Sequence, residues 1–235
     1  MSQEFTTLIS RLKTMKSRYF FVLSTFYVSE AMIELREVEK NRETMNKFNN
    51  FFDFTQKALQ VYFLLELAKL FDYSDQALHI TKIINYTESN LRSLSAKDFA
   101  ESNQSREFID ELVENYRGMS HTDLYKIKSQ LKQHRTTIRK LTTYRNKYLA
   151  HDDLKKVDVE LTYDEITSIL KILEEILNLF SSRFDASTTL YNHIEIGCKN
   201  DTKMVVEYLS RFEPYRLKEI DEQYDRELEK QWRPK

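Results

Sequence analysis

Residues 127–152 read IKSQLKQHRTTIRKLTTYRNKYLAHD, a segment that combines an apolar stripe with an excess of positive charge. Its apolar positions recur at alternating steps of four and three, which predicts one buried face of an amphipathic helix. That face consists of Ile127, Leu131, His134, Ile138 and Leu141. The next position on the same face is Arg145, whose guanidinium keeps its charge and is seldom buried without a partner. We therefore expect Arg145 to meet a carboxylate, a polar cleft, a second copy of the chain or an anionic ligand.

The composition of the whole chain favours long helices joined by polar connections. Its 235 residues include only two glycines and two prolines, the residues that most often mark turns. Cys198 is the single cysteine, which excludes an intramolecular disulfide and a multi-cysteine zinc site. No run of about 18 apolar residues occurs, so no membrane segment is expected. We expect a soluble, cytoplasmic protein.

Caps and apolar spacing predict an all-α fold. Long helices are expected over about 5–39, 47–71, 120–150 and 162–184, with boundaries uncertain by about two to four residues. The heavy apolar content of 47–71 predicts a central helix. Two N-terminal capping pairs support these positions, Ser120 with Asp123 and Thr162 with Glu165.

Shorter helices are expected between and after the long ones. One begins at Asp72 or Ser74, and another begins at Ser102 or Asn103 and ends at Gly118 in a left-handed conformation. Gly197 and Pro214 are expected to interrupt the last part of the chain. We divide the chain into a helical domain, 1–186, and a C-terminal helical appendage, 187–235. The final helix of the appendage is rich in charged residues, so it should lie on the surface or pack against a second chain.

Positive charge is concentrated in the segment from Leu124 to His151, which contains no Asp or Glu. Four of its cations repeat at steps of four, three and four, and therefore share one helix face. They are Lys128, Lys132, Arg135 and Arg139, and Lys147 adds a further charge. Two interpretations stay open: a solvated face that pairs with acids of neighbouring helices, and a track for the phosphate backbone of RNA.

The segment around Arg145 resembles a known family signature. Arg145-Asn146 and His151, with five residues between Arg145 and His151, look like the R-x(4-6)-H motif of the HEPN superfamily (higher eukaryotes and prokaryotes nucleotide-binding domain). Together with Phe51-Phe52 and the stretch 64–72, LLELAKLFD, the chain is similar to the AbiU-like abortive-infection branch over about 48–184. The resemblance implies a HEPN-like helical bundle, often dimeric. It also implies a metal-independent endoribonuclease of a phage-defence or toxin-type system, with no cofactor, and with RNA and an antitoxin or other protein as partners.

The three motif residues suit metal-free RNA cleavage. An imidazole such as that of His151 titrates in the range needed for acid or base catalysis. A guanidinium such as that of Arg145 can stabilise charge that accumulates on a phosphate, and Asn146 can orient either group. On one continuous helix, Arg145 and His151 would lie about 120° apart. Either the helix unwinds before His151, or two copies of the segment meet in a homodimer, as the resemblance implies.

Other interpretations of the same residues stay open. Arg145 could pair with a buried acid such as Glu66, and His151 could serve as a C-terminal helix cap. A non-catalytic HEPN module that binds RNA, a nucleotide or a protein partner would carry the same motif. A metal-dependent phosphohydrolase of the HD type would use His151-Asp152 with His121 or His134, although the spacing of these histidines on one helix does not suit it.

Overall fold

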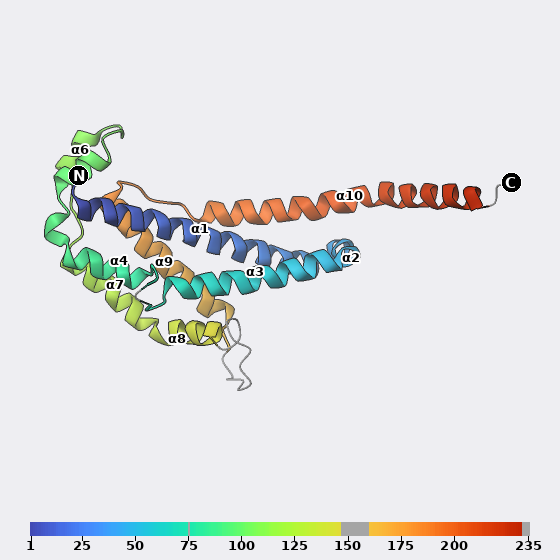
Figure 1. Cartoon of the computed structure of the whole chain (residues 1–235), viewed down its shortest axis with the longest axis horizontal. Helices are drawn as coiled ribbons and strands as arrows, with labels where there is room; N and C mark the ends of the chain where they lie inside the picture. Colours follow the sequence, from blue (N-terminus) through green and yellow to red (C-terminus); the bar gives the residue numbers. More distant parts are fainter. Residues whose placement is uncertain (75, 147–159, 232–235) are drawn as a thin grey trace.

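The computed structural model describes residues 1–74, 76–146 and 160–231, and every regular element in these ranges is a helix. The predicted all-α fold is therefore confirmed. The helices are α1 (Gln3–Glu37), α2 (Glu39–Lys47), α3 (Asn49–Leu70), α4 (Ile80–Ser89), α5 (Ala96–Ser102), α6 (Ile109–Glu114), α7 (His121–Gln133), α8 (Arg135–Tyr144), α9 (Tyr163–Phe184) and α10 (Asn192–Gln231), with a 3₁₀ turn at Leu91–Ser93. The long helices α1, α3 and α10 lie side by side along the molecule, α4 and α6 lie toward the end that holds the N-terminus, and α2 lies at the opposite end of α1 and α3 (Figure 1).

The main core lies where α1, α3 and α9 meet. α1 begins at the cap Ser2, whose hydroxyl accepts a hydrogen bond from the N–H of Phe5. Its apolar side chains, at steps of three and four, are buried along the length of the helix because they share one face. Tyr19 is fully buried in this core, and its hydroxyl donates to the carbonyl of Leu170 in α9 at 2.7 Å. Such a bond satisfies a polar group that burial would otherwise leave unpaired.

The predicted central position of the segment 47–71 is wrong. One face of α3 is buried through Phe52, Phe63 and Leu67, but Phe51 and Phe54 are exposed. The neighbouring helices therefore cover only some of the apolar side chains of this segment. The first predicted helix ends within the expected two to four residues of its predicted end, where the extended backbone of Val38 separates α1 from α2.

Three predicted helix boundaries in the middle of the chain are also wrong. α4 begins only after His79, whose ring nitrogen accepts from the N–H of Lys82, so Asp72 and Ser74 lie in a connection. Ser95 caps the start of α5, and α5 ends at Ser102. A helix therefore ends where one was expected to begin, at Ser102 or Asn103. Gly118 does not adopt a positive φ angle and closes no helix in the left-handed conformation.

Both capping pairs around the charged segment are confirmed. Ser120 with Asp123 and Thr162 with Glu165 form reciprocal caps at the starts of α7 and α9. The single helix expected over 120–150 is instead divided at His134, which ends α7 and precedes α8. The Nδ1 atom of His134 lies 3.3 Å from the hydroxyl of Ser168 in α9, so this histidine has a structural partner.

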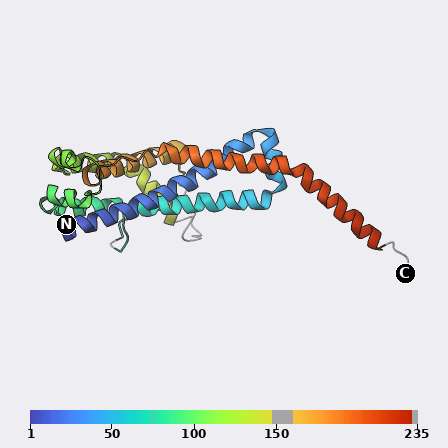
Figure 2. The same cartoon turned by 90° about the horizontal axis from the view of Figure 1, so that it is seen from above.

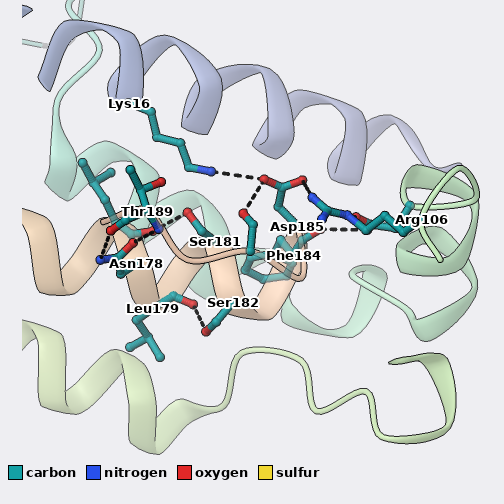
Figure 3. A network of polar contacts seen from close by, with 12 residues as sticks. Lys16, Arg106, Asn178, Leu179, Ser181, Ser182, Phe184, Asp185 and Thr189 are labelled. Atoms are coloured by element: carbon teal, nitrogen blue, oxygen red, sulfur yellow. Dashed lines mark hydrogen bonds and ion pairs between the residues drawn. The ribbon is translucent and has the colours of Figure 1, made fainter. Parts of the chain in front are cut away.

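The end of α9 is held by an acidic residue between two cations. Lys16 of α1 and Arg106 approach Asp185 from opposite sides, with N–O distances of 3.2 and 3.1 Å (Figure 3). The Ser187 hydroxyl also donates to this carboxylate at 2.8 Å. Although burial opposes ionisation, these contacts hold the pKa of Asp185 below its usual range. The network ties the C-terminus of α9 to α1 and to the short helices.

α10 is one long helix, so the predicted interruptions at Gly197 and Pro214 are wrong. Its first half packs against α1 and α2 through Val206 and Leu209, in a second apolar cluster that includes Met45 and Phe52. Proline lacks the N–H that would donate to the preceding turn, and interior prolines bend helices. α10 changes direction in its second half and extends beyond α2 (Figure 2). The predicted boundary between 186 and 187 falls in the connection from α9 to α10 and stays a prediction.

Candidate functional site

Arg145 is placed by α8, whose buried face of Ile138 and Leu141 packs against the core. Arg145 and Asn146 continue α8 in a wider, π-helical turn. Such turns are rare and are often found at functional sites. α8 lies against α3, which ends at Leu70 and is followed by the buried Phe71 and then Asp72. The end of one helix therefore brings Asp72 to Arg145 from 73 positions away in the sequence.

The guanidinium of Arg145 is held by two oxygen atoms. Its Nη1 donates to Asp72 Oδ2 at 2.6 Å, and its Nε donates to Asn146 Oδ1 at 2.9 Å. The side chain of Arg145 is 17 % exposed and that of Asp72 is 27 % exposed. The prediction that Arg145 meets a carboxylate is confirmed. The suggested partner Glu66 is wrong, because Glu66 instead contacts Arg18 and Lys69.

The third nitrogen of this guanidinium is the part that could meet a ligand. Among the described residues, the Nη2 atom of Arg145 has no hydrogen-bond partner. The hydrogen bond from Arg145 is the main cause that holds the pKa of the Asp72 carboxyl below its ordinary value. A guanidinium that is fixed on two sides and keeps donors on a third side is suited to binding an anion.

Asn146 is the second motif residue that the structure describes, and its exposed side chain accepts the hydrogen bond from Arg145. This contact places Asn146 beside the guanidinium, and its orienting role stays a prediction. Lys147 and His151, the other two residues expected in this segment of the site, lie outside the described residues.

The cations of α7 and α8 do not form one straight track, because the chain breaks at His134 between them. Three of them, Lys128, Lys132 and Arg135, instead line a pocket of about 270 Å³, whereas Arg139 is exposed outside it. The other walls of the pocket are mainly apolar and include Phe71, Tyr73, Ile84, Leu131 and Ile138. Phe71 and Tyr73 are the sequence neighbours of Asp72, so this pocket adjoins the Asp72–Arg145 pair.

Both interpretations of the basic segment find support. Lys128 pairs with Glu88 at 2.6 Å and Lys140 pairs with Glu165 at 2.6 Å, as expected for a face that contacts neighbouring helices. Within the described part of the chain, no ion pair joins Lys132, Arg135 or Arg139 to an acid. These three cations therefore keep their charge available to an anion.

A larger pocket of about 480 Å³ lies between α1, α3 and the start of α9, lined in part by Phe26, Val61 and Tyr163. Glu30 and Glu34 also line it and give it acidic groups. Lys57 also lines this pocket and Lys199 pairs with both glutamates, so it offers no excess of positive charge to a phosphate, and the smaller basic pocket is the better candidate.

The sequence pattern predicted that Arg145 needs a partner but did not identify Asp72. The chain has 37 acidic residues, and no spacing along it relates Asp72 to Arg145. Asp72 was instead expected to begin a helix. Only the packing of α3 against α8 selects it.

No group of three or more His, Cys, Asp or Glu residues within 1–74, 76–146 and 160–231 is arranged to hold a metal ion. His121 is exposed at the start of α7, and His134 contacts Ser168 at its other end. The HD-type alternative therefore gains no ligands from the described residues.

A comparison with protein families decides the wider relationship. The HEPN_AbiU2 family model, described as AbiU2, matches residues 4–205. The chain belongs to the HEPN_AbiU2 family. The match to AbiU2 covers most of the chain, and it is wider than the range 48–184 that carried the resemblance. It includes the Arg145–His151 motif, passes the predicted domain boundary at 186, and ends before Pro214.

No curated protein and no solved structure matches this AbiU2 family member. No described helix is both long and apolar enough to cross a bilayer. The AbiU2 relationship, the all-α fold and the Asp72–Arg145–Asn146 contacts together define the candidate site.

Proposed function

We propose that this protein is a metal-independent endoribonuclease of a phage-defence or toxin-type system. Its site would be built on Arg145, Asn146 and His151. The observation that carries the proposal is the state of Arg145, which is held by Asp72 and Asn146 while its Nη2 donors have no partner among the described residues. The adjoining pocket, with Lys132 and Arg135, adds positive charge where the neighbouring phosphates of an RNA strand would lie.

In the proposed reaction, the 2′-oxygen of the RNA attacks the adjacent phosphorus and the bond to the 5′-oxygen breaks. A proton leaves the 2′-hydroxyl and a proton reaches the 5′-oxygen, so the products are a 2′,3′-cyclic phosphate and a free 5′-hydroxyl. His151 carries out one of these proton transfers, because histidine is the side chain that most often serves as a general acid or base. Arg145 donates to the phosphate oxygens as their charge grows, and Asn146 keeps the guanidinium in position.

The active form in this proposal is a homodimer in which two copies of the segment 145–151 face each other. A second imidazole would then be present for the other proton transfer. RNA is the substrate, and an antitoxin or other protein is the expected controlling partner. The protein is expected to act in the cytoplasm without a cofactor.

The test is RNA cleavage by the purified full chain in excess chelator. We expect products that end in a 2′,3′-cyclic phosphate and a loss of about 100-fold or more in His151→Ala. The matched control is His193→Ala, which removes an exposed histidine of α10 and should cleave like the unchanged protein. Equal cleavage by the two variants, or cleavage that needs a divalent metal, would contradict the proposal.

A second candidate is a non-catalytic module that binds RNA, a nucleotide or a protein. The observation that favours it is the Asp72–Arg145 ion pair, which already gives the arginine a structural partner. Under this alternative, the chain binds RNA through Arg145 but yields no cleaved product in any condition.

A further inference from the structure

The larger pocket, between α1, α3 and the start of α9, reaches the residue that precedes Arg145. Tyr144, the last residue of α8, lines this pocket. Leu64, the last residue of α3 that lines it, precedes Asp72 by about two turns of helix. The Asp72–Arg145 pair therefore lies near two pockets of different chemistry, the basic pocket and the larger pocket.

Aromatic rings form part of the wall of the larger pocket. Phe26 and Phe63 are nearly buried and meet edge to face, with their ring centroids 5.3 Å apart. The ring of Tyr163 stacks against Phe26 at a centroid distance of 6.0 Å, and its hydroxyl donates to the carboxylate of Glu30. Tyr163 is thereby fixed in place, although the residue is 56 % exposed. A fixed and exposed aromatic ring is suited to stack on another flat ring.

The charged groups in and around the larger pocket nearly cancel. Lys199 of α10 contacts the carboxylates of Glu30 and Glu34, which line the pocket, and that of Glu195, which lies outside it. Lys57 adds a second cation to the lining. Three acids and two lysines leave a charge of −1 over this region. The larger pocket therefore disfavours an anion and suits a neutral ligand that offers hydrogen-bond donors.

Three polar side chains of the larger pocket keep hydrogen-bonding groups that no described residue uses. Ser29 is only 3 % exposed, yet its hydroxyl makes no hydrogen bond within the described part of the chain. The amide of Gln60 is likewise without a described partner, and Glu34 uses Oε1 for Lys199 but leaves Oε2 unpaired there. Buried hydroxyls are nearly always hydrogen-bonded, so the Ser29 hydroxyl is a group that an entering molecule can satisfy. The three side chains offer both donors and acceptors.

We propose that the larger pocket binds one unpaired purine base of the RNA strand whose phosphates lie at Arg145 and the basic pocket. This inference rests on the proposed function, which makes RNA the substrate. The base stacks on Tyr163, its amino group donates to Glu34 Oε2 or to the Gln60 oxygen, and one of its acceptors bonds the Gln60 amide or the Ser29 hydroxyl. A purine is preferred to uracil, which has no amino group, and to cytosine, whose single ring stacks over a smaller area.

The first test measures the binding of RNA that cannot be cut. Pentamers of adenosine or of uridine with 2′-O-methyl groups lack the 2′-hydroxyl that would attack the phosphorus, so they separate binding from chemistry. At one salt concentration, we expect the full chain to bind the adenosine pentamer about 10-fold or more tightly than the uridine pentamer, because stacking and the amino group both favour adenine. Equal affinities for the two pentamers would overturn the proposal.

The second test locates this preference in the larger pocket. Gln60→Ala removes an amide that bonds no described residue, so the variant should fold normally and lose about 5-fold or more of the preference for adenosine. The matched control is Gln56→Ala, which removes an amide one turn earlier on α3, outside the pocket lining, and should keep the preference. Ser29→Leu places a larger side chain in the pocket and should abolish the preference. A full preference in Gln60→Ala, or in folded Ser29→Leu, would overturn the proposal.

RNA cleavage by the same protein separates this proposal from the nuclease proposal. If the chain cuts no RNA but shows a preference for adenosine that depends on Gln60, the nuclease proposal fails and the base-binding pocket stands. If the chain cuts RNA but binds the two pentamers equally, the base-binding pocket fails and the nuclease proposal stands.

Discussion

Replacing Arg145 with alanine separates its structural role from its proposed chemical role, because the two roles predict losses of different size. The change leaves Asp72 without its ion-pair partner, but Asp72 is 27 % exposed and water can reach its carboxylate. We therefore expect a loss of about 1–2 kcal/mol in the free energy of unfolding, less than the cost of about 3–5 kcal/mol for orphaning a fully buried partner. For a chain of this size, the melting temperature should fall by about 3–6 °C.

Such a loss leaves the protein folded at 25 °C if its stability lies in the ordinary range of about 5–15 kcal/mol. Removal of a group that stabilises the transition state costs about 100-fold or more in rate, or about 2.7 kcal/mol in activation free energy. RNA cleavage in chelator at 25 °C should therefore fall by at least this factor, while circular dichroism reports a folded protein.

The matched control is Arg18→Ala. Arg18 contacts Glu66 and the carbonyl of Leu78, and its side chain is 25 % exposed. It therefore resembles Arg145 both in having an acidic partner and in its degree of burial. This variant should lose similar stability and keep its cleavage. If Arg145→Ala keeps more than a tenth of the cleavage rate, or if Arg18→Ala loses as much, the chemical role of Arg145 is refuted.

Three further predictions concern charge. The pKa of Asp72 is lower in the folded state than in the unfolded state, so the ionised carboxylate stabilises the fold at any pH above the ordinary aspartate pKa of about 3.9. This stabilisation is lost as the pH falls through the pKa that Asp72 has in the folded protein. In urea titrations, the stability difference between the unchanged protein and Asp72→Asn should be constant from about pH 5 to 8 and shrink below about pH 4, and a difference that grows toward acid pH would contradict this. Lys132→Glu with Arg135→Glu should weaken RNA binding and reduce the slope of log affinity against log salt by about 1.4, whereas the same change at Lys203 and Arg211 of α10 should not. If the changes at Lys203 and Arg211 weaken binding as much as those at Lys132 and Arg135, RNA does not bind at the basic pocket. Lys199 contacts carboxylates of Glu30, Glu34 and Glu195 at 2.9–3.1 Å, so Lys199→Met should lower the melting temperature by about 3–6 °C, and an unchanged melting temperature would show that these contacts add no net stability.

Local chemistry was predicted well from the sequence. The caps at Ser120 and Thr162 involve partners three residues away, so the pattern contains all the groups that form them. The need of Arg145 for a partner also follows from one helix face. The family relationship rested on the motif and was confirmed by the family model.

Features set by distant residues were not predicted. The apolar spacing continues unchanged on both sides of His134, so it gives no sign that the helix breaks there. The contact of His134 with Ser168 involves a different helix, α9. Gly197 and Pro214 weaken a helix locally, but packing and neighbouring turns maintain α10 through both. The exposure of Phe51 and Phe54 depends on which face of α3 meets its neighbours, and an apolar run does not contain that information.

Asp72 gives the candidate site an anion of its own before any ligand arrives. A small monoanion such as chloride or acetate gains little at Arg145, since the Asp72 carboxylate already balances the charge of the guanidinium. Under the proposed function, a strand with several phosphates would gain more, because it would reach Lys132 and Arg135 while one phosphate contacts the Nη2 donors of Arg145. The ion pair would then act as a threshold that favours a polyanion over a single small anion.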